Sequence, residues 1–238
     1  MSVVTIEGSV GSGAPDVGRI VAREQGLDFV DRLLLSEIAR RVGSTVEALH
    51  ESERRAPTRV ERFAQLVQRM LERSSVAGSG GDPYFGPGIE TLLARPYREL
   101  EDPSSGSSQA LDEQRFISTT SEVIRDIAEA GNVVILSRGG GAILRDKPGV
   151  LRVGLVGQKE DRARRLMQRD QLGSLDEAMK LIEQSDKAQT RYFQKAFGCS
   201  PTDPFLYHVM WNTSEVSIEY AAAMISDATR KMAEQGLR

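Results

Sequence analysis

Short apolar runs alternate with helical patterns along most of this chain. The expected strands are Val3–Ile6, Leu27–Val30, Val133–Leu136, Val150–Val156 and Tyr207–Trp211. The first is continuously apolar, which is typical of a strand that is covered on both faces. Helical spacing predicts helices between the strands, over 15–25, 33–42, 111–130 and 174–196. A basic helix carrying Arg162 to Arg169 and an amphipathic helix at the end of the chain are also expected. Five strands that alternate with helices predict a parallel sheet with helices on both faces, whose ligands bind at the carboxyl ends of the strands.

The middle of the chain has a different composition. Ser44 and Glu47 form a capping-box pattern that begins a long charged segment, which runs to about Ser75. Two stretches rich in Gly, Ser and Pro, Ser74–Pro87 and Glu101–Ser108, are expected to be flexible connections. The sequence therefore predicts one domain over 1–238 with a helical and flexible insertion over 44–110. Apolar positions in the 44–75 helix fit either a homodimer seam or packing on the core.

Charge and composition exclude several classes of function. With 31 basic and 34 acidic residues, the net charge of −3 gives no electrostatic basis for binding nucleic acid or an anionic membrane. Cys199, His50 and His208 are too few for a Cys/His metal cluster. Because no signal peptide or membrane-spanning apolar run is evident, a cytoplasmic location is expected.

A glycine-rich turn follows the first expected strand. Gly8 and Gly13 have the spacing of the Walker A loop, G-x-x-x-x-G-K-[ST], in which backbone N–H groups surround a phosphate, the lysine reaches the outer phosphates and the hydroxyl binds Mg²⁺. Ala14 stands in place of the lysine, and Pro15 in place of the hydroxyl residue. The geometry of a nucleotide-binding loop is therefore predicted without its two most diagnostic side chains.

Other polar residues follow the remaining strands. Asp31 and Arg32 follow the second strand, Arg138 the third and Thr213 the last. An arginine directly after an apolar strand lies at the carboxyl edge of the sheet, where its charge requires a partner such as a phosphate. This convergence indicates an anion site at that edge.

Together these motifs resemble the cytidylate kinase-like family. The resemblance rests on Gly11-Ser12-Gly13 through Gly18, Asp31-Arg32, Arg138-Gly139, the helical Asp186, Arg191 and Tyr192, and Asp203 to Tyr207 running into Asn212-Thr213-Ser214. It covers nearly the whole chain and is weakest between about Ser44 and Ser108.

The resemblance implies a P-loop NTPase-type three-layer α/β fold with a five-stranded parallel sheet. It also implies ATP and Mg²⁺ as cofactors, a nucleoside monophosphate such as CMP or dCMP as acceptor, and a lid-like helical region over 160–200. The implied roles fall into three groups: Gly8, Gly11, Ser12, Gly13, Ala14 and Gly18 bind the cofactor; Arg138, Arg191 and Asp186 are catalytic; Asp31, Arg40 and Arg41 bind the acceptor.

The chain also departs from the family pattern. Gly139 stands where cytidylate kinases have an aspartate, and Gln189 where many relatives carry an arginine. Two further interpretations therefore stay open: a weak or inactive nucleotide-binding regulatory or scaffold protein, and a phosphotransferase with a non-nucleotide acceptor. Arg19 could substitute for the missing lysine or be a solvated helix residue. The basic run from Arg162 to Arg169 is either a solvated helix face or part of a lid.

Overall fold

A parallel sheet forms the centre of the protein. The computed structural model describes residues 2–31, 107–136 and 139–235. In these residues, five strands pair in the order β2-β3-β1-β4-β5. They are β1 (Val3–Gly8), β2 (Asp28–Val30), β3 (Val133–Leu136), β4 (Val150–Val156) and β5 (Val209–Asn212). All their pairings are parallel, and β1 lies between β3 and β4. The segments that follow the strands therefore leave the sheet at one edge, as the alternating pattern predicts.

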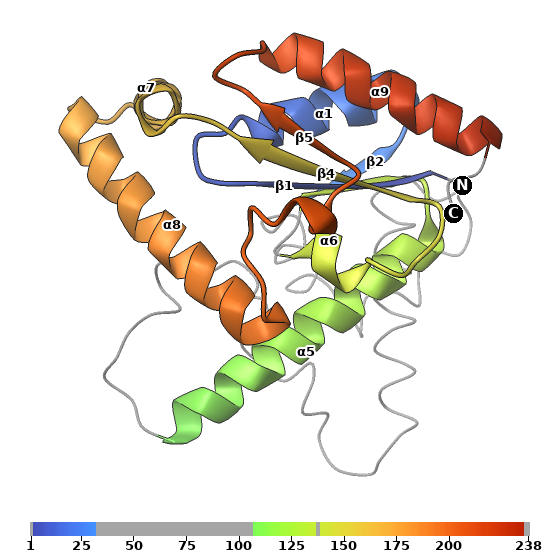
Figure 1. Cartoon of the computed structure of the whole chain (residues 1–238), viewed down its shortest axis with the longest axis horizontal. Helices are drawn as coiled ribbons and strands as arrows, with labels where there is room; N and C mark the ends of the chain where they lie inside the picture. Colours follow the sequence, from blue (N-terminus) through green and yellow to red (C-terminus); the bar gives the residue numbers. More distant parts are fainter. Residues whose placement is uncertain (1, 32–106, 137–138, 236–238) are drawn as a thin grey trace, which may run out of the picture.

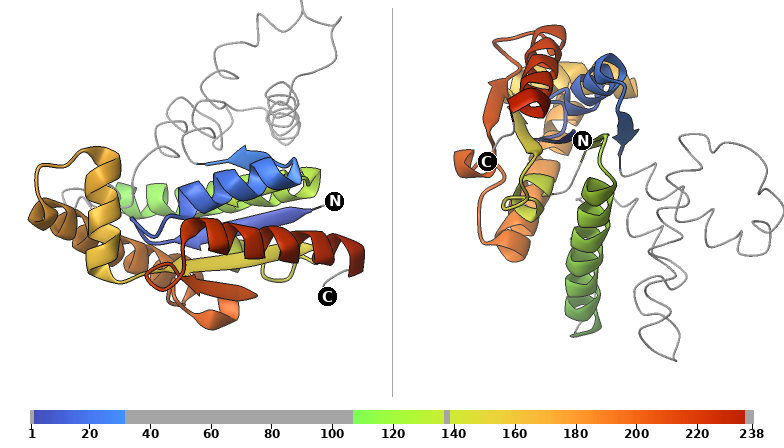
Figure 2. Two further views of the ribbon diagram at one scale, coloured as in Figure 1. Left: turned by 90° about the horizontal axis from the view of Figure 1, so that it is seen from above. Right: turned by 90° about the vertical axis from the view of Figure 1, so that its right-hand side faces the viewer.

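Helices cover both faces of this sheet (Figures 1 and 2). Helices α1 (Ala14–Gln25) and α9 (Ile218–Gln235) pack side by side on one face. Helices α5 (Ser107–Ala130) and α6 (Gly140–Ile143) lie on the other. Helices α7 (Lys159–Asp170) and α8 (Leu175–Phe197) pack against each other beyond the carboxyl ends of the strands. The three-layer α/β architecture is thus confirmed.

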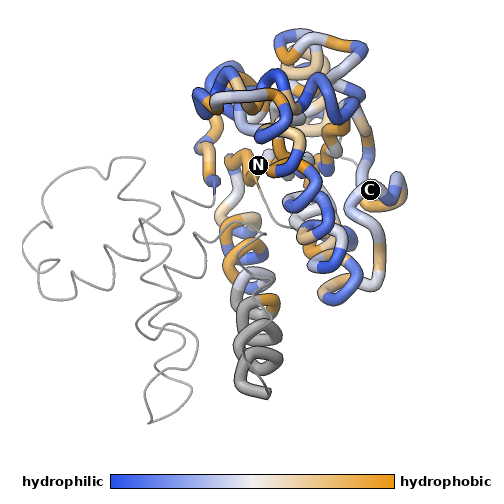
Figure 3. Tube along the Cα trace, turned by 90° about the vertical axis from the view of Figure 1, so that its left-hand side faces the viewer, coloured by the Kyte–Doolittle hydropathy of each residue, from blue (hydrophilic) through white to orange (hydrophobic). Residues whose placement is uncertain are grey.

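Alternate residues of β1 belong to two separate apolar cores, one on each face of the sheet. Val4 and Ile6 pack with Val17 and Val21 of α1 and with Ile225 of α9. On the opposite face, the carboxyl-terminal half of α5 brings apolar side chains to the sheet, as its colouring in Figure 3 shows. Each side chain that is fully buried in this way contributes about 1.5–3 kcal/mol. These two cores fix the sheet and thereby the edge at which the polar residues gather.

Element boundaries differ from the predicted ones where short polar or glycine-rich segments have local structure. Helix α5 begins at Ser107, inside the stretch that was expected to be flexible. The carboxylate of Asp203 accepts a hydrogen bond from the N–H of Phe205 and caps a short 3₁₀ helix, Pro204–Leu206, so β5 begins two residues later than predicted. Helix α6, which begins directly after Gly139, was not among the predicted helices.

Several expectations fall on parts of the chain outside the described residues. These are the helix over 33–42, the Ser74–Pro87 connection, the apolar face over 44–75 with its homodimer seam, and all of the 44–110 insertion except the first residues of α5. Of the helices that are described, none has the length and apolar character needed to cross a membrane.

Candidate phosphate-binding site

The loop from Gly8 to Gly13 joins β1 to α1 at the carboxyl edge of the sheet. Gly11 and Gly13 adopt φ angles of +80° and +83°, which side chains rarely adopt. A Cβ atom at Gly13 would collide with Ile218, and one at Gly11 with the backbone carbonyl of Arg162. Both glycines are therefore required by the conformation of the loop and by the closeness of its neighbours.

Helix α1 begins directly after this loop, so the amino terminus of the helix lies at the loop. Gly13 is the N-cap and provides no side-chain cap. The first backbone N–H groups of a helix have no partner within it, so such a terminus favours an anion. In α1, Pro15 contributes no N–H and the N–H of Asp16 donates to the carbonyl of Gly13 at 3.1 Å, so fewer donors are free there than in an ordinary helix. Ser12 adds a second feature: its Oγ is buried in the loop and has no hydrogen-bond partner among the described residues. The loop therefore offers donors for a phosphate group.

Ala14, at the position of the Walker lysine, faces the apolar core. It is 3% exposed and packs with Ile6 and Val17. Gly18, another predicted cofactor residue, lies further along α1, where a Cβ atom would come within 2.7 Å of the Phe29 ring. Gly18 thus allows α1 to pack closely on the sheet, and it lies outside the loop itself.

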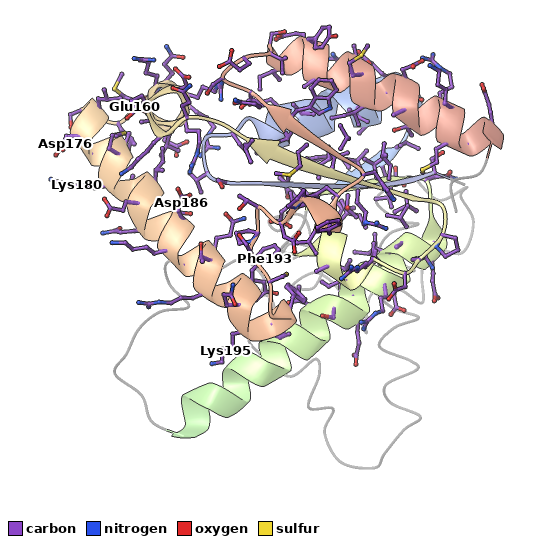
Figure 4. The ribbon with its side chains drawn as sticks, in the orientation of Figure 1. Glu160, Asp176, Lys180, Asp186, Phe193 and Lys195 are labelled. Carbon is purple, nitrogen blue, oxygen red and sulfur yellow. The ribbon has the colours of Figure 1, made fainter. Side chains whose placement is uncertain are left out.

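Arg162 of α7 is the most buried cation near the loop, with 6% of its surface exposed. Its Nε donates a hydrogen bond of 2.9 Å to the carbonyl oxygen of Val10. Its two terminal nitrogens bind both oxygens of Asp186 at 3.0 and 2.6 Å. Figure 4 shows Asp186 on the side of α8 that faces the sheet, and Asp176 and Lys180 on the opposite side. The predicted catalytic carboxylate is therefore engaged by Arg162.

Arg165 links the phosphate loop to the segment that follows β5. Its Nη1 donates to the carbonyl oxygen of Gly11 at 3.2 Å and to Thr213 Oγ1 at 3.0 Å, and its Nη2 donates to the carbonyl oxygen of Thr213. Within the described part of the chain, every partner of Arg165 is a neutral oxygen. Its positive charge, unlike that of Arg162, is not balanced by a carboxylate.

Glu7, which the sequence analysis did not single out, lies at the end of β1 and is 4% exposed. Its Oε2 accepts a hydrogen bond of 2.6 Å from the N–H of Gly139, and its Oε1 accepts one of 3.3 Å from Gln189 Nε2. Gln189, also 4% exposed, accepts in turn from Ser9 Oγ at 3.3 Å. One sequence feature could have identified Glu7 as a site residue: it is a charged residue in an otherwise apolar strand, directly before the glycine loop.

The remaining predicted residues are less closely grouped. Asp31 is half-buried at the end of β2, and Arg191 is exposed on α8. Arg138, Arg40 and Arg41 lie outside the described residues. The structure thus brings together the loop glycines, Ser12 and Asp186, and adds Glu7, Gln189, Arg162 and Arg165 to them.

The arginines that had two interpretations are now placed. Arg164 and Arg169 are exposed and pair with Asp161 and Asp170, so they belong to a solvated face. Arg162 and Arg165 of the same helix contact the loop backbone instead, and for them the solvated-face interpretation is wrong. Arg19 is exposed, pairs with Asp16 at 3.3 Å and lies over the Phe29 ring, as a solvated helix residue would.

Three further side chains, all in the last 40 residues, have structural surroundings. Trp211 packs edge-to-face against Tyr220 of α9. Burial and the charge of Arg152 lower the pKa of His208, whose Nδ1 accepts a hydrogen bond from the Arg152 N–H. Burial raises the pKa of the Cys199 thiol. Among the described residues, no group of three or more His, Cys, Asp or Glu side chains is arranged to hold a metal ion.

Comparisons with known proteins agree with this architecture. The model of the cytidylate kinase-like family matches residues 3–215. A crystal structure of an uncharacterized protein from Eubacterium ventriosum is 16% identical, covers 97% of this chain and 99% of its own, and has a TM-score of 0.61. At this identity the likeness shows a shared fold. No curated protein matches the chain.

Two kinases of known structure are also similar, at lower TM-scores. Shikimate kinase from Acinetobacter baumannii is 14% identical over 99% of this chain and 95% of its own, with a TM-score of 0.45. A gluconokinase from Sinorhizobium meliloti is 13% identical over 98% of this chain and 97% of its own, with a TM-score of 0.46.

Proposed function

The chain belongs to the cytidylate kinase-like family, and we propose that it transfers the γ-phosphoryl group of ATP to CMP, dCMP or a related acceptor. The observation that carries this proposal is the phosphate loop, with left-handed Gly11 and Gly13 and the amino terminus of α1. The loop also holds the buried Ser12 hydroxyl, which has no partner in the part of the chain that the structure describes. These groups are donors, and they suit the phosphates of a nucleotide.

On the donor side, Arg165 supports the proposal through its charge. Phosphoryl transfer depends mostly on positioning and on neutralising the charge of the moving group. The guanidinium of Arg165 donates to the carbonyl of Gly11 and has no carboxylate partner among the described residues, so it places positive charge next to the loop. The residues present fit ATP phosphates better than a bare metal ion, because Pro15 has no hydroxyl. Mg²⁺, which neutralises phosphate charge, would then be held mainly through the phosphates of ATP.

On the acceptor side, we assign Arg138 to the acceptor phosphate because, in the sequence, it comes two residues after the end of β3. Asp31, Arg40 and Arg41 would contact the acceptor nucleotide, and Arg191 the transferring phosphate. An oxygen of the acceptor phosphate forms the new bond to the γ-phosphorus, and the bond from that phosphorus to the β–γ bridging oxygen breaks. The electron pair of that bond leaves with ADP, so no oxidant or further reactant is needed.

A second candidate function is nucleotide binding without turnover. It is favoured by Ala14, which packs in the core where a phosphate-bridging lysine would be, and by Asp186, which is engaged by Arg162. Loss of one such stabilising group typically costs about 2.7–4 kcal/mol, or about 10²–10³ in rate. A protein with this loop would then respond to ATP without consuming it quickly.

Chromatographic detection of ADP and of the matching diphosphate tests the proposal. Purified protein is incubated with Mg-ATP and each of CMP, dCMP, UMP and AMP, beside Arg138→Ala and the matched control Arg23→Ala, which removes an exposed arginine at the end of α1. We expect diphosphate from a pyrimidine acceptor, lost only in Arg138→Ala. No turnover with nucleotide binding retained would overturn the kinase in favour of the binding protein. ADP formed only with an added non-nucleotide alcohol or acid would indicate a different acceptor class.

A further inference from the structure

A buried chain of hydrogen bonds joins three separate parts of the site. Ser9 of the phosphate loop donates to Gln189 of α8, Gln189 donates to Glu7 at the end of β1, and Glu7 accepts from the N–H of Gly139. Gly139 begins the turn into α6 and directly follows Arg138. The chain therefore connects the loop proposed for ATP with the turn proposed for the acceptor.

The positions of these groups argue against a purely local role. The residues that each bond joins are 132 to 182 positions apart in the sequence. Each bond therefore connects two different parts of the fold: the loop to α8, α8 to β1, or β1 to the Gly139 turn. Glu7 and Gln189 are each 4% exposed, and buried polar groups of this kind are costly unless every partner is in place. Their bonds are therefore expected to specify one arrangement of the three elements.

Helix α8 also holds the same turn by packing. Gly139 has a φ of +92°, and a Cβ atom there would collide with the ring of Phe197. Gln189 and Phe197 are eight residues apart and lie on one face of α8, so the helix contacts the turn through a polar and an apolar residue. Asp186, on the same helix, fastens Arg162 and through it Val10 of the loop. A displacement of α8 would thus move the loop and the turn together.

We propose that Gln189 and Glu7 are positioning residues that hold the phosphate loop and the Gly139 turn in one fixed relation. Neither touches the reacting atoms. The proposal rests on the proposed function for its consequence, which is that donor and acceptor nucleotides are aligned and bind cooperatively. The hydrogen-bonded link itself is independent of that function.

A reciprocal exchange of the two side chains tests the link. In Gln189→Glu alone, two carboxylates face each other. In Glu7→Met alone, the N–H of Gly139 and the amide of Gln189 both lose their acceptor. In the double variant Glu7→Gln/Gln189→Glu, Gln at 7 accepts from Gly139 and donates to Glu at 189, which accepts from Ser9. All three bonds and the net charge are then retained. Gln194→Glu, on the exposed face of α8, is the matched control for the added charge.

The first measurement is amide hydrogen exchange, which needs no nucleotide. We expect both single variants to exchange faster at residues 9–13 and 139–143, and the double variant to return to the wild-type rates. Faster exchange confined to the turn of α8 around residue 189 would overturn the proposal. So would a double variant that folds, by its circular dichroism and melting temperature, and still exchanges as fast as the single variants.

The second measurement is calorimetric binding of a non-hydrolysable ATP analogue and of CMP, separately and together. We expect each ligand to raise the affinity for the other about tenfold in the wild type, and this coupling to vanish in the single variants and return in the double variant. Coupling retained in the single variants would overturn the proposal. If the wild type binds neither nucleotide, the proposed function fails, and the exchange rates alone decide whether the link exists.

Discussion

Arg162 of α7 and Asp186 of α8 form an ion pair through two parallel hydrogen bonds, of 3.0 and 2.6 Å. The two partners differ in environment, because the arginine side chain is 7% exposed and the aspartate 38%. Since Arg162 also donates to the carbonyl of Val10, the pair fastens the phosphate loop to both helices. A sequence motif that resembled a catalytic aspartate is, in this structure, a partner that holds an arginine in place.

Asp186→Ala is expected to lower the free energy of unfolding by about 1–3 kcal/mol. Removing the carboxylate leaves a buried guanidinium without its counter-charge, which costs about 3–5 kcal/mol in a fully buried pair. The expected loss is smaller here because Asp186 is partly exposed and water replaces some of its hydrogen bonds. Urea unfolding followed by circular dichroism measures the difference.

Asp227→Ala is the matched control for this prediction. Asp227 on α9 is also 38% exposed, but its partners Arg230 and Lys231 are 58% and 64% exposed. We expect Asp227→Ala to lower the free energy of unfolding by much less than Asp186→Ala does, because water screens an exposed ion pair. If Asp186→Ala and Asp227→Ala lower the free energy of unfolding equally, burial of Arg162 does not strengthen its ion pair with Asp186.

Gly13→Ala is expected to destabilise the protein more than Gly26→Ala does. Both residues have positive φ, +83° and +64°, so an alanine at either position bears a backbone cost of about 1–2 kcal/mol. A Cβ atom at Gly13 also collides with Ile218, whereas nothing lies within 4 Å of one at Gly26. We therefore expect an extra loss of about 1 kcal/mol or more at Gly13 in thermal or urea unfolding.

The variants Gly13→Ala and Gly26→Ala also test whether the conformation of the phosphate loop is needed to bind ATP. Gly13→Ala is expected to weaken binding of an ATP analogue, while Gly26→Ala, at the far end of α1, leaves it unchanged. Adding Ile218→Ala to Gly13→Ala should recover part of the lost stability, because it opens space for the new methyl group. Additive losses in this double variant would contradict the steric explanation.

The sheet could be predicted from the sequence because its strands are apolar runs with glycines or polar residues at their ends. Val3–Ile6 and Val133–Leu136 are buried on both faces, so their pattern depends little on their neighbours. Boundaries were less predictable where a single side chain decides them. Asp203 caps a 3₁₀ helix directly before the segment that was expected to begin β5, and nothing in the periodicity indicates that hydrogen bond.

The loop glycines could also be predicted, because their spacing encodes a backbone shape. Partners across the fold could not. Glu7 and Gln189 lie 182 positions apart, and Arg162 contacts Val10 over 152 positions. Both links depend on how α7 and α8 pack beyond the sheet, which no local pattern specifies. Arg165 differs from the exposed Arg164 only by its position on the helix, so composition alone could not separate the cation that contacts the loop from its solvated neighbour.

Cys199 is expected to react slowly with thiol reagents at neutral pH. Burial, with a smaller contribution from the charge of Asp203, raises the pKa of this thiol above its ordinary value of 9.0. Because the thiolate is the reactive form and the raised pKa lowers its fraction at any given pH, Cys199 reacts more slowly than an ordinary cysteine and its alkylation midpoint lies at higher pH. The pH dependence of alkylation measures this directly, since Cys199 is the one cysteine in the chain.

The variant Asp203→Asn distinguishes the effect of burial on the pKa of Cys199 from the effect of the Asp203 charge. Asparagine keeps the cap on the N–H of Phe205 and removes the charge. We therefore expect the midpoint of the alkylation profile to move to lower pH while staying above that of a free thiol. A wild-type midpoint at or below the ordinary value would contradict the role of burial.

Arg165→Gln is expected to weaken binding of an ATP analogue about tenfold, equivalent to about 1.4 kcal/mol. Arg165 donates to Gly11 and to Thr213, and in the described residues its charge has no carboxylate partner. Glutamine can keep a hydrogen bond to the loop, so the loss reports mainly on charge, and the salt dependence of binding should fall with it. Arg164→Gln, one position earlier and paired with Asp161, is the matched control and should leave the affinity unchanged. If the two variants bind alike, the charge behind the phosphate loop does not compensate for the absent lysine, and binding depends on the backbone donors of the loop and of α1.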